Sequence, residues 1–227
     1  MSCHAEAALP LSALDPLIIL AGHPNVGKSV LFKRLTGRYV TVSNYPGTTV
    51  EVSQGQAVLD GRRTLVVDAP GINSLTSLSD DERVTRDLLL QRHPDAVVQV
   101  GDAKNLARAL FLTLQFAEMG APLILDLNMT DEARRQGIHI DYDRLGERLG
   151  IPVVPTIATR GEGVGDLVAS LPHATIPHLR VTYAPAIEAG LAAIESVLPG
   201  DLPGRRGRAV MLLAGEIDAA LGLALDE

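Results

Sequence analysis

The strongest constraint on the fold of this chain is a glycine-rich turn between an apolar run and a helix-like stretch. Residues 22–29 read Gly-His-Pro-Asn-Val-Gly-Lys-Ser, which fits the pattern G-x-x-x-x-G-K-[ST]. The apolar run 17–21 precedes this segment, and a helix is predicted over residues 28–36. Glycines let backbone N–H groups turn toward phosphate oxygens, and a helix N-terminus adds partial positive charge. The segment therefore predicts a phosphate-binding loop; a turn that only caps a helix is the alternative.

Apolar runs of strand length alternate with helix-like stretches along much of the chain. Residues 51–58 and 64–68 flank Asp60-Gly61, a strong hairpin signal. Further strands are predicted at residues 96–100, 122–127 and 152–155, and helices at residues 83–91, 105–118, 142–149 and 164–171. This alternation predicts an α/β fold with a mostly parallel sheet and helices on both faces. Ligands of such sheets bind at the carboxyl ends of the strands.

Prolines divide the chain into three predicted parts. Residues 1–16 form an irregular lead-in, and residues 17–171 hold the α/β pattern. In residues 172–227, Pro172 and Pro177 mark a linker, and helices are predicted at residues 186–198 and 208–225. Each of these helices has one apolar face and is not stable alone, so we expect a small C-terminal α-helical domain packed on the main one.

Charge and composition exclude several classes of protein. The formal net charge is −7 over 227 residues, which disfavours nucleic-acid binding because that requires clustered positive charge. No apolar run reaches the ~18–20 residues of a membrane helix, so we expect no membrane insertion of this segment. The single cysteine, Cys3, excludes a disulfide framework and fits a reducing, intracellular compartment.

Several side chains are predicted to act at the phosphates. Lys28 would reach the β- and γ-phosphates, and the Ser29 hydroxyl would bind Mg²⁺. Residues 68–71 read Asp-Ala-Pro-Gly and fit the pattern D-x-x-G. Asp68 would hold Mg²⁺ through water, and the Gly71 N–H would contact the γ-phosphate. A threonine hydroxyl from the segment 44–51 would complete the Mg²⁺ shell.

A second segment indicates which base the site takes. Residues 127–131 read Leu-Asn-Met-Thr-Asp and follow a buried strand, in a pattern similar to N-K-x-D. The Asp131 carboxylate can accept hydrogen bonds from N1–H and the 2-amino group of guanine, donors that adenine lacks. Met129 replaces the usual lysine, so the base loses one cationic chain that would stack on it. An Asx turn that ends a strand is the alternative interpretation.

These motifs together resemble one family, the cytosolic N-terminal G domain of FeoB-type ferrous iron transporters. The similarity runs from about residue 17 to residue 163, and more weakly through the helical tail. Its most specific parts are residues 44–51, Asn-Tyr-Pro-Gly-Thr-Thr-Val-Glu, and the Leu-Asn-Met stretch at 127–129. The resemblance implies a P-loop GTPase domain of the Ras-like class that uses GTP or GDP, Mg²⁺ and K⁺.

The resemblance also implies residue roles. Thr49 would bind Mg²⁺ beside Ser29, and Asn25 would coordinate K⁺, which supplies the charge neutralisation that an arginine finger gives elsewhere. Ile72 stands where Ras-like proteins carry a water-orienting glutamine, so hydrolysis would rely on backbone groups, switch segments and cations. The implied catalytic residues are Asn25, Lys28, Thr49 and Gly71. The implied nucleotide contacts are Gly22, His23, Pro24, Asn25, Val26, Gly27, Lys28, Ser29, Val30, Gly47, Thr48, Thr49, Asp68, Ala69, Pro70, Gly71, Asn128, Met129, Asp131, Thr156, Ile157 and Ala158.

Ser43 and Tyr45 stand where glycine and tryptophan are common in the family, in the segment expected to close as the first switch, and two further positions also depart from the family pattern. His23 stands where asparagine is usual and introduces a group that can titrate near physiological pH. Ile157 stands where serine or threonine usually precedes Ala158, whose N–H could still contact the guanine O6. The lost hydroxyl removes one contact that stabilises this loop.

The implied setting is the cytoplasmic face of the bacterial inner membrane. There the domain would hydrolyse GTP to drive or gate Fe²⁺ uptake by its own transmembrane permease domain. Residues 172–227 would be a GDI-like helical appendage leading to that permease, and small Feo accessory proteins are further expected partners. Two alternatives remain: a nucleotide-gated binding module with only residual hydrolysis, and a ribosome-associated Era-like GTPase, which the acidic balance disfavours.

Overall fold

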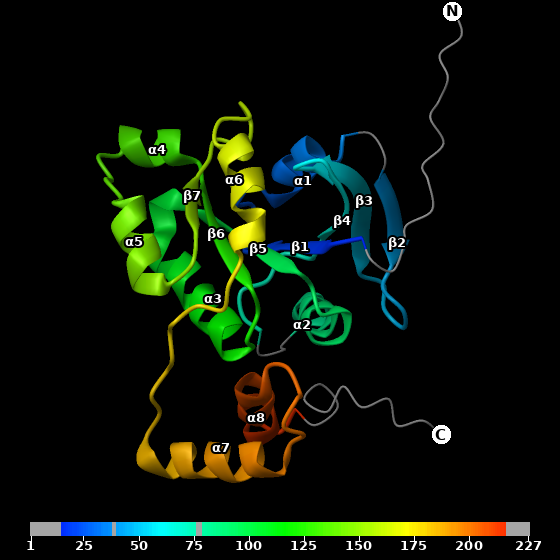
Figure 1. Cartoon of the computed structure of the whole chain (residues 1–227), viewed down its shortest axis with the longest axis vertical. Helices are drawn as coiled ribbons and strands as arrows, with labels where there is room; N and C mark the ends of the chain where they lie inside the picture. The colour runs from blue at the N-terminus through cyan, green and yellow to red at the C-terminus, as the bar shows by residue number, and fades with distance from the viewer. Residues whose placement is uncertain (1–14, 38–39, 76–78, 217–227) are drawn as a thin grey trace, which may run out of the picture.

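A seven-stranded sheet forms the centre of the molecule, as a computed structural model shows for residues 15–37, 40–75 and 79–216 (Figure 1). The strands lie in the order β2-β3-β4-β1-β5-β6-β7. β3 pairs antiparallel with β2 and β4, and the other neighbours pair parallel. The strands are β1 (Leu17–Gly22), β2 (Val40–Asn44), β3 (Glu51–Leu59), β4 (Arg62–Asp68), β5 (Ala96–Asp102), β6 (Leu123–Asn128) and β7 (Val153–Pro155).

Helices cover both faces of this sheet. They are α1 (Lys28–Thr36), α2 (Asp80–Arg92), α3 (Leu106–Glu118), α4 (Thr130–Arg135), α5 (Tyr142–Leu149) and α6 (Val164–Ser170), with short 3₁₀ turns at Ala103–Asn105 and Leu171–His173. Apolar residues of α2, α3 and α5 join one core cluster, and those of α1 and α6 join another. The strand β6, which lies between β5 and β7, is buried along its whole length, as expected of a parallel strand covered on both sides.

Two more helices, α7 (Pro185–Val197) and α8 (Arg205–Leu213), lie below the sheet in Figure 1. Leu191 of α7 is fully buried, and α8 packs against α3. A Cβ at Gly207 of α8 would lie 2.5 Å from the Met119 sulfur, so a glycine permits this close approach. Arg206 of α8 donates a 2.8 Å hydrogen bond to Glu188 of α7 and lies 3.7 Å from Glu118 of α3. No helix in the described ranges is long and apolar enough to cross a bilayer.

The predicted hairpin around Asp60-Gly61, the mostly parallel sheet and the two-sided helix packing are all confirmed. Two elements were missed. β2 is exposed at every residue, so it carries no apolar run, and α4 has only six residues. The predicted helix 83–91 begins at Asp80, because the Ser79 side chain caps it by accepting a hydrogen bond from the Glu82 N–H.

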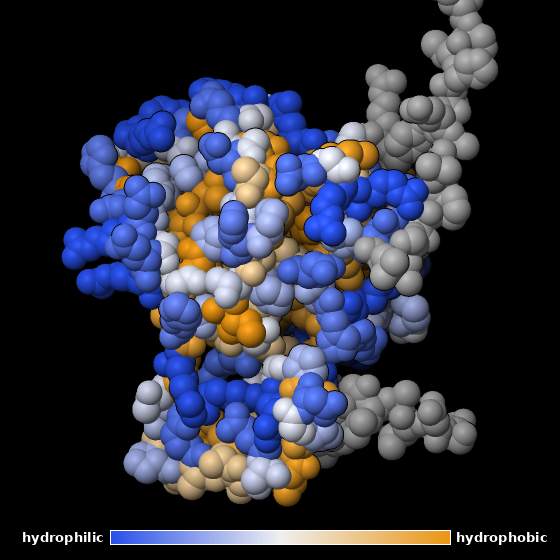
Figure 2. All heavy atoms as spheres, in the orientation of Figure 1, coloured by the Kyte–Doolittle hydropathy of each residue, from blue (hydrophilic) through white to orange (hydrophobic). Residues whose placement is uncertain are grey.

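The exposed face of α5 carries charged side chains. Figure 2 shows hydrophilic side chains gathered over α5, whose Asp143, Arg144, Glu147 and Arg148 are exposed. The predicted helix 208–225 is a helix over Arg205–Leu213, and its part beyond residue 216 lies outside the described residues, as does most of the predicted lead-in. The division into a main domain and a helical domain stays a prediction.

We predict that Phe116→Ala lowers the free energy of unfolding by roughly 3–5 kcal/mol, because it empties a fully buried site between α3 and the sheet. Phe111 lies on the same helix and is 54% exposed, so Phe111→Ala is the matched control and should cost less than about 1 kcal/mol. Urea unfolding of both variants measures the difference. Equal losses would contradict the packing described for α3.

Candidate functional site

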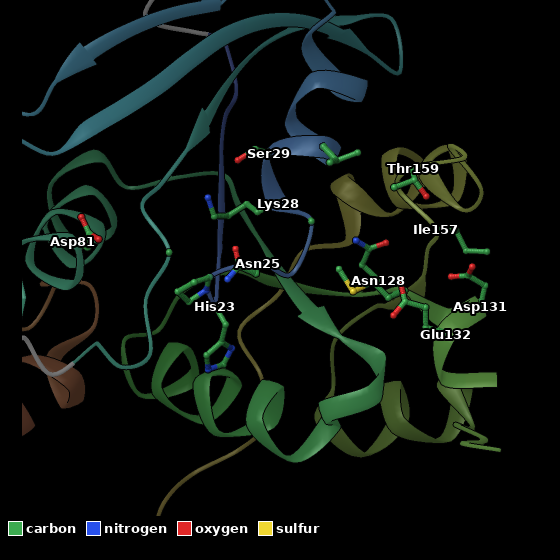
Figure 3. Close-up of a pocket in the computed structure, with 15 residues that line it drawn as sticks. His23, Asn25, Lys28, Ser29, Asp81, Asn128, Asp131, Glu132, Ile157 and Thr159 are labelled. Atoms are coloured by element: carbon green, nitrogen blue, oxygen red, sulfur yellow. The ribbon is translucent and has the colours of Figure 1, made fainter. Parts of the chain in front are cut away.

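A cavity of about 590 Å³ opens at the carboxyl ends of the central strands (Figure 3). Figure 3 shows Asn25, Lys28 and Ser29 grouped on one side, Asp131, Ile157 and Thr159 on the other, and Asn128 between them. The lining residues are His23, Pro24, Asn25, Gly27, Lys28, Ser29, Val30, Gly71, Asp81, Asn128, Met129, Asp131, Glu132, Ile157 and Thr159. The loops after β1, β4, β6 and β7 all contribute, as a topological switch point requires.

Twelve of the residues predicted to contact nucleotide line this cavity. They are His23, Pro24, Asn25, Gly27, Lys28, Ser29, Val30, Gly71, Asn128, Met129, Asp131 and Ile157. Gly22, Val26, Asp68, Ala69, Pro70, Thr156 and Ala158 lie in the same loops or strand ends but not on the lining. Gly47, Thr48 and Thr49 belong to a separate segment.

The phosphate loop leaves the positive end of α1 open to the cavity. Gly27 is the N-cap with φ 90°, no side chain caps the helix, and its first turn holds no acidic residue. Gly22 must be a glycine for a different reason: a Cβ there would lie 2.2 Å from the Val100 carbonyl oxygen. The N-terminus of α1 therefore offers backbone N–H groups and a partial positive charge to an anion.

Lys28 and Asp68 form a nearly buried ion pair at this end. Lys28 Nζ lies 2.5 Å from Asp68 Oδ1, and their side chains are 11% and 8% exposed. The sequence predicted that Lys28 meets phosphate and Asp68 meets Mg²⁺ through water, whereas the structure joins them to each other. Both roles stay predictions, and both require this pair to open.

The loop after β4 rests directly on the phosphate loop. The Ala69 N–H donates to the Leu20 carbonyl and the Ile72 N–H to the Gly22 carbonyl, each at 3.0 Å. A Cβ at Gly71 would lie 3.0 Å from Pro24 Cα. Ile72 is fully buried, so its side chain takes part in the core and does not reach water in the cavity.

Asn128 ties the two sides of the cavity together. Its Nδ2 donates to the Val26 carbonyl at 2.9 Å, and its Oδ1 accepts from the Ala158 N–H at 2.9 Å. A Cβ at Gly27 would lie 2.2 Å from Asn128 Nδ2, so the amide also requires glycine at that position. The Ala158 N–H, predicted to contact guanine O6, is thus engaged by Asn128 in this structure.

The Asp131 carboxylate, predicted to read the base, faces two arginines. Its Oδ2 accepts from Arg135 Nη2 at 2.6 Å and lies 3.5 Å from Arg160 Nη2. Desolvation raises the pKa of Asp131, but the hydrogen bond from Arg135 and the charges of both arginines outweigh it and lower the pKa below its usual range. The carboxylate is therefore ionised, which is the form that accepts hydrogen bonds from guanine.

The predicted Mg²⁺ ligand Thr49 lies outside the cavity lining and is exposed. The neighbouring Thr48 hydroxyl donates to the Tyr45 carbonyl at 3.0 Å and accepts from the Val50 N–H at 3.2 Å, which closes this segment into a turn. The role of Gly47, Thr48 and Thr49 stays a prediction that needs the segment to move.

His23 lines the cavity as expected, but its side chain is nearly buried. It is 3% exposed, and in Figure 3 its ring points away from Lys28 and Ser29. Burial, and then the charge of Arg108, lowers the pKa of His23 below its ordinary value, so the ring is neutral at neutral pH. The expected titration near physiological pH is therefore displaced to lower pH.

Sequence reasoning missed three lining residues: Asp81, Glu132 and Thr159. Asp81 lies in the first turn of α2, where an acidic side chain favours the helix dipole and gives no separate signal of a binding site. Thr159 follows the base loop and Glu132 follows Asp131 directly, so adjacency to a motif was the available signal. Glu132 pairs with Lys104 of the turn after β5.

We predict that Gly27→Ala destabilises the fold by about 1–3 kcal/mol more than Gly37→Ala does. Both glycines flank α1 at positive φ, but a Cβ at Gly37 meets nothing within 4 Å, whereas one at Gly27 collides with Asn128. Thermal unfolding measures both. In the double variant with Asn128→Ala the loss should be smaller than the sum of the single losses, because the collision is gone. Additive losses would show that Asn128 does not impose this glycine.

Known proteins and a family model are similar to this chain. The family model for ferrous iron transport protein B matches residues 17–171. The Fe(2+) transporter FeoB of Escherichia coli (strain K12) is 39% identical over 206 residues, which are 87% of this chain and 27% of that protein. FeoB of Salmonella typhimurium is 45% identical over 149 residues, 64% of this chain and 19% of that protein. The chain thus spans about a quarter of the length of these curated relatives.

Solved structures are similar over nearly the whole chain. The cytosolic domain of the T. maritima FeoB iron transporter in its GMPPNP form has a TM-score of 0.82 at 35% identity, covering 93% of this chain and 87% of that one. An S. thermophilus NFeoB mutant bound to GDP has a TM-score of 0.80 at 36% identity, covering 93% of this chain and 84% of that one. The chain therefore belongs to the family of ferrous iron transport protein B and carries its N-terminal P-loop GTPase domain.

Proposed function

We propose that the cavity binds GTP and hydrolyses it to GDP and phosphate. The observation that carries this is one cavity with two unlike ends: the open N-terminus of α1 with Lys28 and Ser29, and the ionised Asp131. The first end suits a polyphosphate, and the second suits the N1–H and 2-amino donors of guanine. Similar solved domains are in a GMPPNP form and bound to GDP, which supports a guanine nucleotide here.

The residues at the phosphate end fit Mg²⁺ and K⁺. Ser29, Asp68 and Thr49 offer the hard oxygen ligands that Mg²⁺ prefers, and the Asn25 amide oxygen offers one to K⁺. Bound cations would neutralise charge that develops on the phosphate oxygens. Lys28 would then leave Asp68 for the phosphates, and Thr49 would move inward from its exposed position.

No predicted site residue supplies a side chain at position 72 that could orient the attacking water. Ile72 is buried and apolar, so the Gly71 N–H, Lys28 and the Asn25 amide are the groups left to orient the γ-phosphate. We therefore expect slow intrinsic turnover. A nucleotide-gated module with residual hydrolysis is the second candidate, favoured by this same lack of a water-orienting side chain.

The curated relatives are named Fe(2+) transporters, and for this chain we propose the corresponding regulatory role. The domain would drive or gate Fe²⁺ uptake by its own permease domain at the cytoplasmic face of the bacterial inner membrane, with small Feo accessory proteins as further partners. Two observations support a path for the signal: α2 follows the Gly71 loop along the chain, and Arg86 of α2 forms an ion pair with Glu216 beyond α8. The net charge of −7 disfavours the ribosome-associated alternative.

We predict that Asp131→Ala weakens GTP binding by roughly 10- to 100-fold and leaves the weak ATP binding unchanged, because only guanine donates to this carboxylate. Displacement of fluorescent mant-GDP measures both affinities. Asp143→Ala on α5 removes an exposed carboxylate that does not line the cavity and serves as the control. Wild-type protein that binds ATP as tightly as GTP would overturn the proposed specificity.

We predict that K⁺ raises phosphate release from GTP by at least about tenfold over Na⁺, and that Asn25→Ala removes this difference. The physical reason is that the Asn25 amide would hold the cation beside the β- and γ-phosphates. Steady-state phosphate release in matched chloride buffers measures it, with mant-GDP binding as the check that the variant still takes nucleotide. Equal, residual rates in both salts would favour the nucleotide-gated module.

A further inference from the structure

Asp126 is a buried carboxyl that the proposed hydrolysis does not use. It lies in β6 between Val100 of β5 and Val154 of β7, and it is 0% exposed. Alternation along the strand places it on the same face as Asn128, two residues on. Its Oδ2 has no hydrogen-bond partner among the described residues. Burying a carboxyl group is energetically costly unless it is hydrogen-bonded, so the contact of its other oxygen, Oδ1, is important.

The hydrogen-bond partner of Asp126 Oδ1 is Thr156, in the loop after β7. Its hydroxyl oxygen lies 2.6 Å from Asp126 Oδ1 and 3.3 Å from Asn128 Oδ1. A threonine hydroxyl has one hydrogen, so it cannot donate to both oxygens at once. Which of them receives the hydrogen depends on whether Asp126 itself carries a proton.

The two protonation states give two different networks. When Asp126 is protonated, its own O–H donates to Thr156, and the Thr156 hydroxyl is free to donate to Asn128. Asn128 Oδ1 then accepts from both Thr156 and the Ala158 N–H. When Asp126 is ionised, the Thr156 hydroxyl turns to the carboxylate, and Asn128 Oδ1 keeps only Ala158.

The environment of Asp126 brings the pKa of its carboxyl group close to neutral pH. Burial raises the pKa of Asp126 to about 7, against the smaller opposing effect of the Thr156 hydrogen bond. The charged side chains on the elements around this face are Lys28, Lys33 and Arg34 of α1, Asp166 of α6, Arg160 and Glu162 of the loop before α6, and Asp102 at the end of β5. The causes of the shift in the pKa of Asp126 are burial and the Thr156 hydrogen bond, ahead of any of these charges.

We propose that Asp126 is a positioning residue for nucleotide binding, whose proton directs the Thr156 hydroxyl to Asn128 and so stiffens the amide that joins the base loop to the phosphate loop. This rests on the proposed function of the cavity as a guanine-nucleotide site. Asn128 also donates to the Val26 carbonyl, so a loss at its Oδ1 loosens both loops. The consequence is nucleotide release that quickens as Asp126 ionises.

The test is the release rate of mant-GDP between pH 5.5 and pH 8.5. We expect the wild-type rate to rise on the order of fivefold across the range, since one hydrogen bond to Asn128 is lost. Asp126→Asn keeps the shape and donates permanently to Thr156, so its rate should stay slow at every pH. His23 and the nucleotide phosphates titrate equally in both proteins, and the difference between the two profiles isolates Asp126.

Two threonine variants separate positioning from packing. Thr156→Val removes the relay and should give a fast rate that no longer depends on Asp126. Thr130→Val is the matched control, because its equally buried hydroxyl bonds only the Thr156 carbonyl, at 3.1 Å. Its pH profile should follow the wild type. A Thr130→Val profile that follows Thr156→Val, or an Asp126→Asn profile that follows the wild type, overturns the proposal.

Unfolding measurements keep the proposal testable apart from nucleotide. The pKa of Asp126 is higher in the folded than in the unfolded chain, so its contribution to stability is lost as pH rises toward about 7. The melting temperature of wild type should therefore fall behind that of Asp126→Asn between pH 5 and pH 8. A constant gap would overturn the ionisation, whereas failure to bind mant-GDP at any pH would overturn the proposed function instead.

Discussion

The buried side-chain amide of Asn128 is the contact on which the candidate site depends. It donates to the loop after β1 at Val26 and accepts from the loop after β7 at Ala158, each at 2.9 Å. Both ends of the cavity are thus fixed to one group, and the glycine at position 27 exists to leave room for it. Breaking either bond leaves a buried polar group unpaired, at a cost of about 1–3 kcal/mol. The geometry of the phosphate end and of the base end is therefore not independent.

The charges at the two ends share a second property. Lys28 is paired with Asp68, and Asp131 is paired with Arg135, before any ligand is considered. A phosphate that contacts Lys28 has to replace the Lys28–Asp68 contact, so the affinity of the nucleotide is the difference between new and old pairs rather than the sum of new ones. The Lys28–Asp68 pair is nearly buried, and separating it without a substitute for each partner is unfavourable. Under the proposed function, phosphate for Lys28 and a cation for Asp68 would have to arrive together for the exchange to be balanced.

More of the fold than of the candidate site could be predicted from the sequence. Buried parallel strands and the loop at residues 22–29 have strong local signals, because burial on both faces leaves an apolar run and a phosphate loop needs fixed glycines. The exposed strand β2 has no such signal, and neither has the turn that keeps Thr49 away from the cavity. The tie through Asn128 joins positions 26, 128 and 158, and no local pattern records a contact of that range. The Lys28–Asp68 pair escaped for the same reason.

The polar residues of β6 form a pattern that can be interpreted once the bounds of the strand are known. β6 is apolar except at Asp126 and Asn128, and two polar residues at alternate positions of a fully buried strand must share one face. Packing alone would place apolar residues there, as it does at Ile124 on the same face. On this face of β6, the residues up to Ile124 therefore pack in the core, whereas Asp126 and Asn128 form hydrogen bonds to the loops at the end of the sheet. Because Thr156 reaches both members of the pair, the strength with which Asn128 holds those loops is set from inside the sheet, by a carboxyl that no ligand in the cavity would touch.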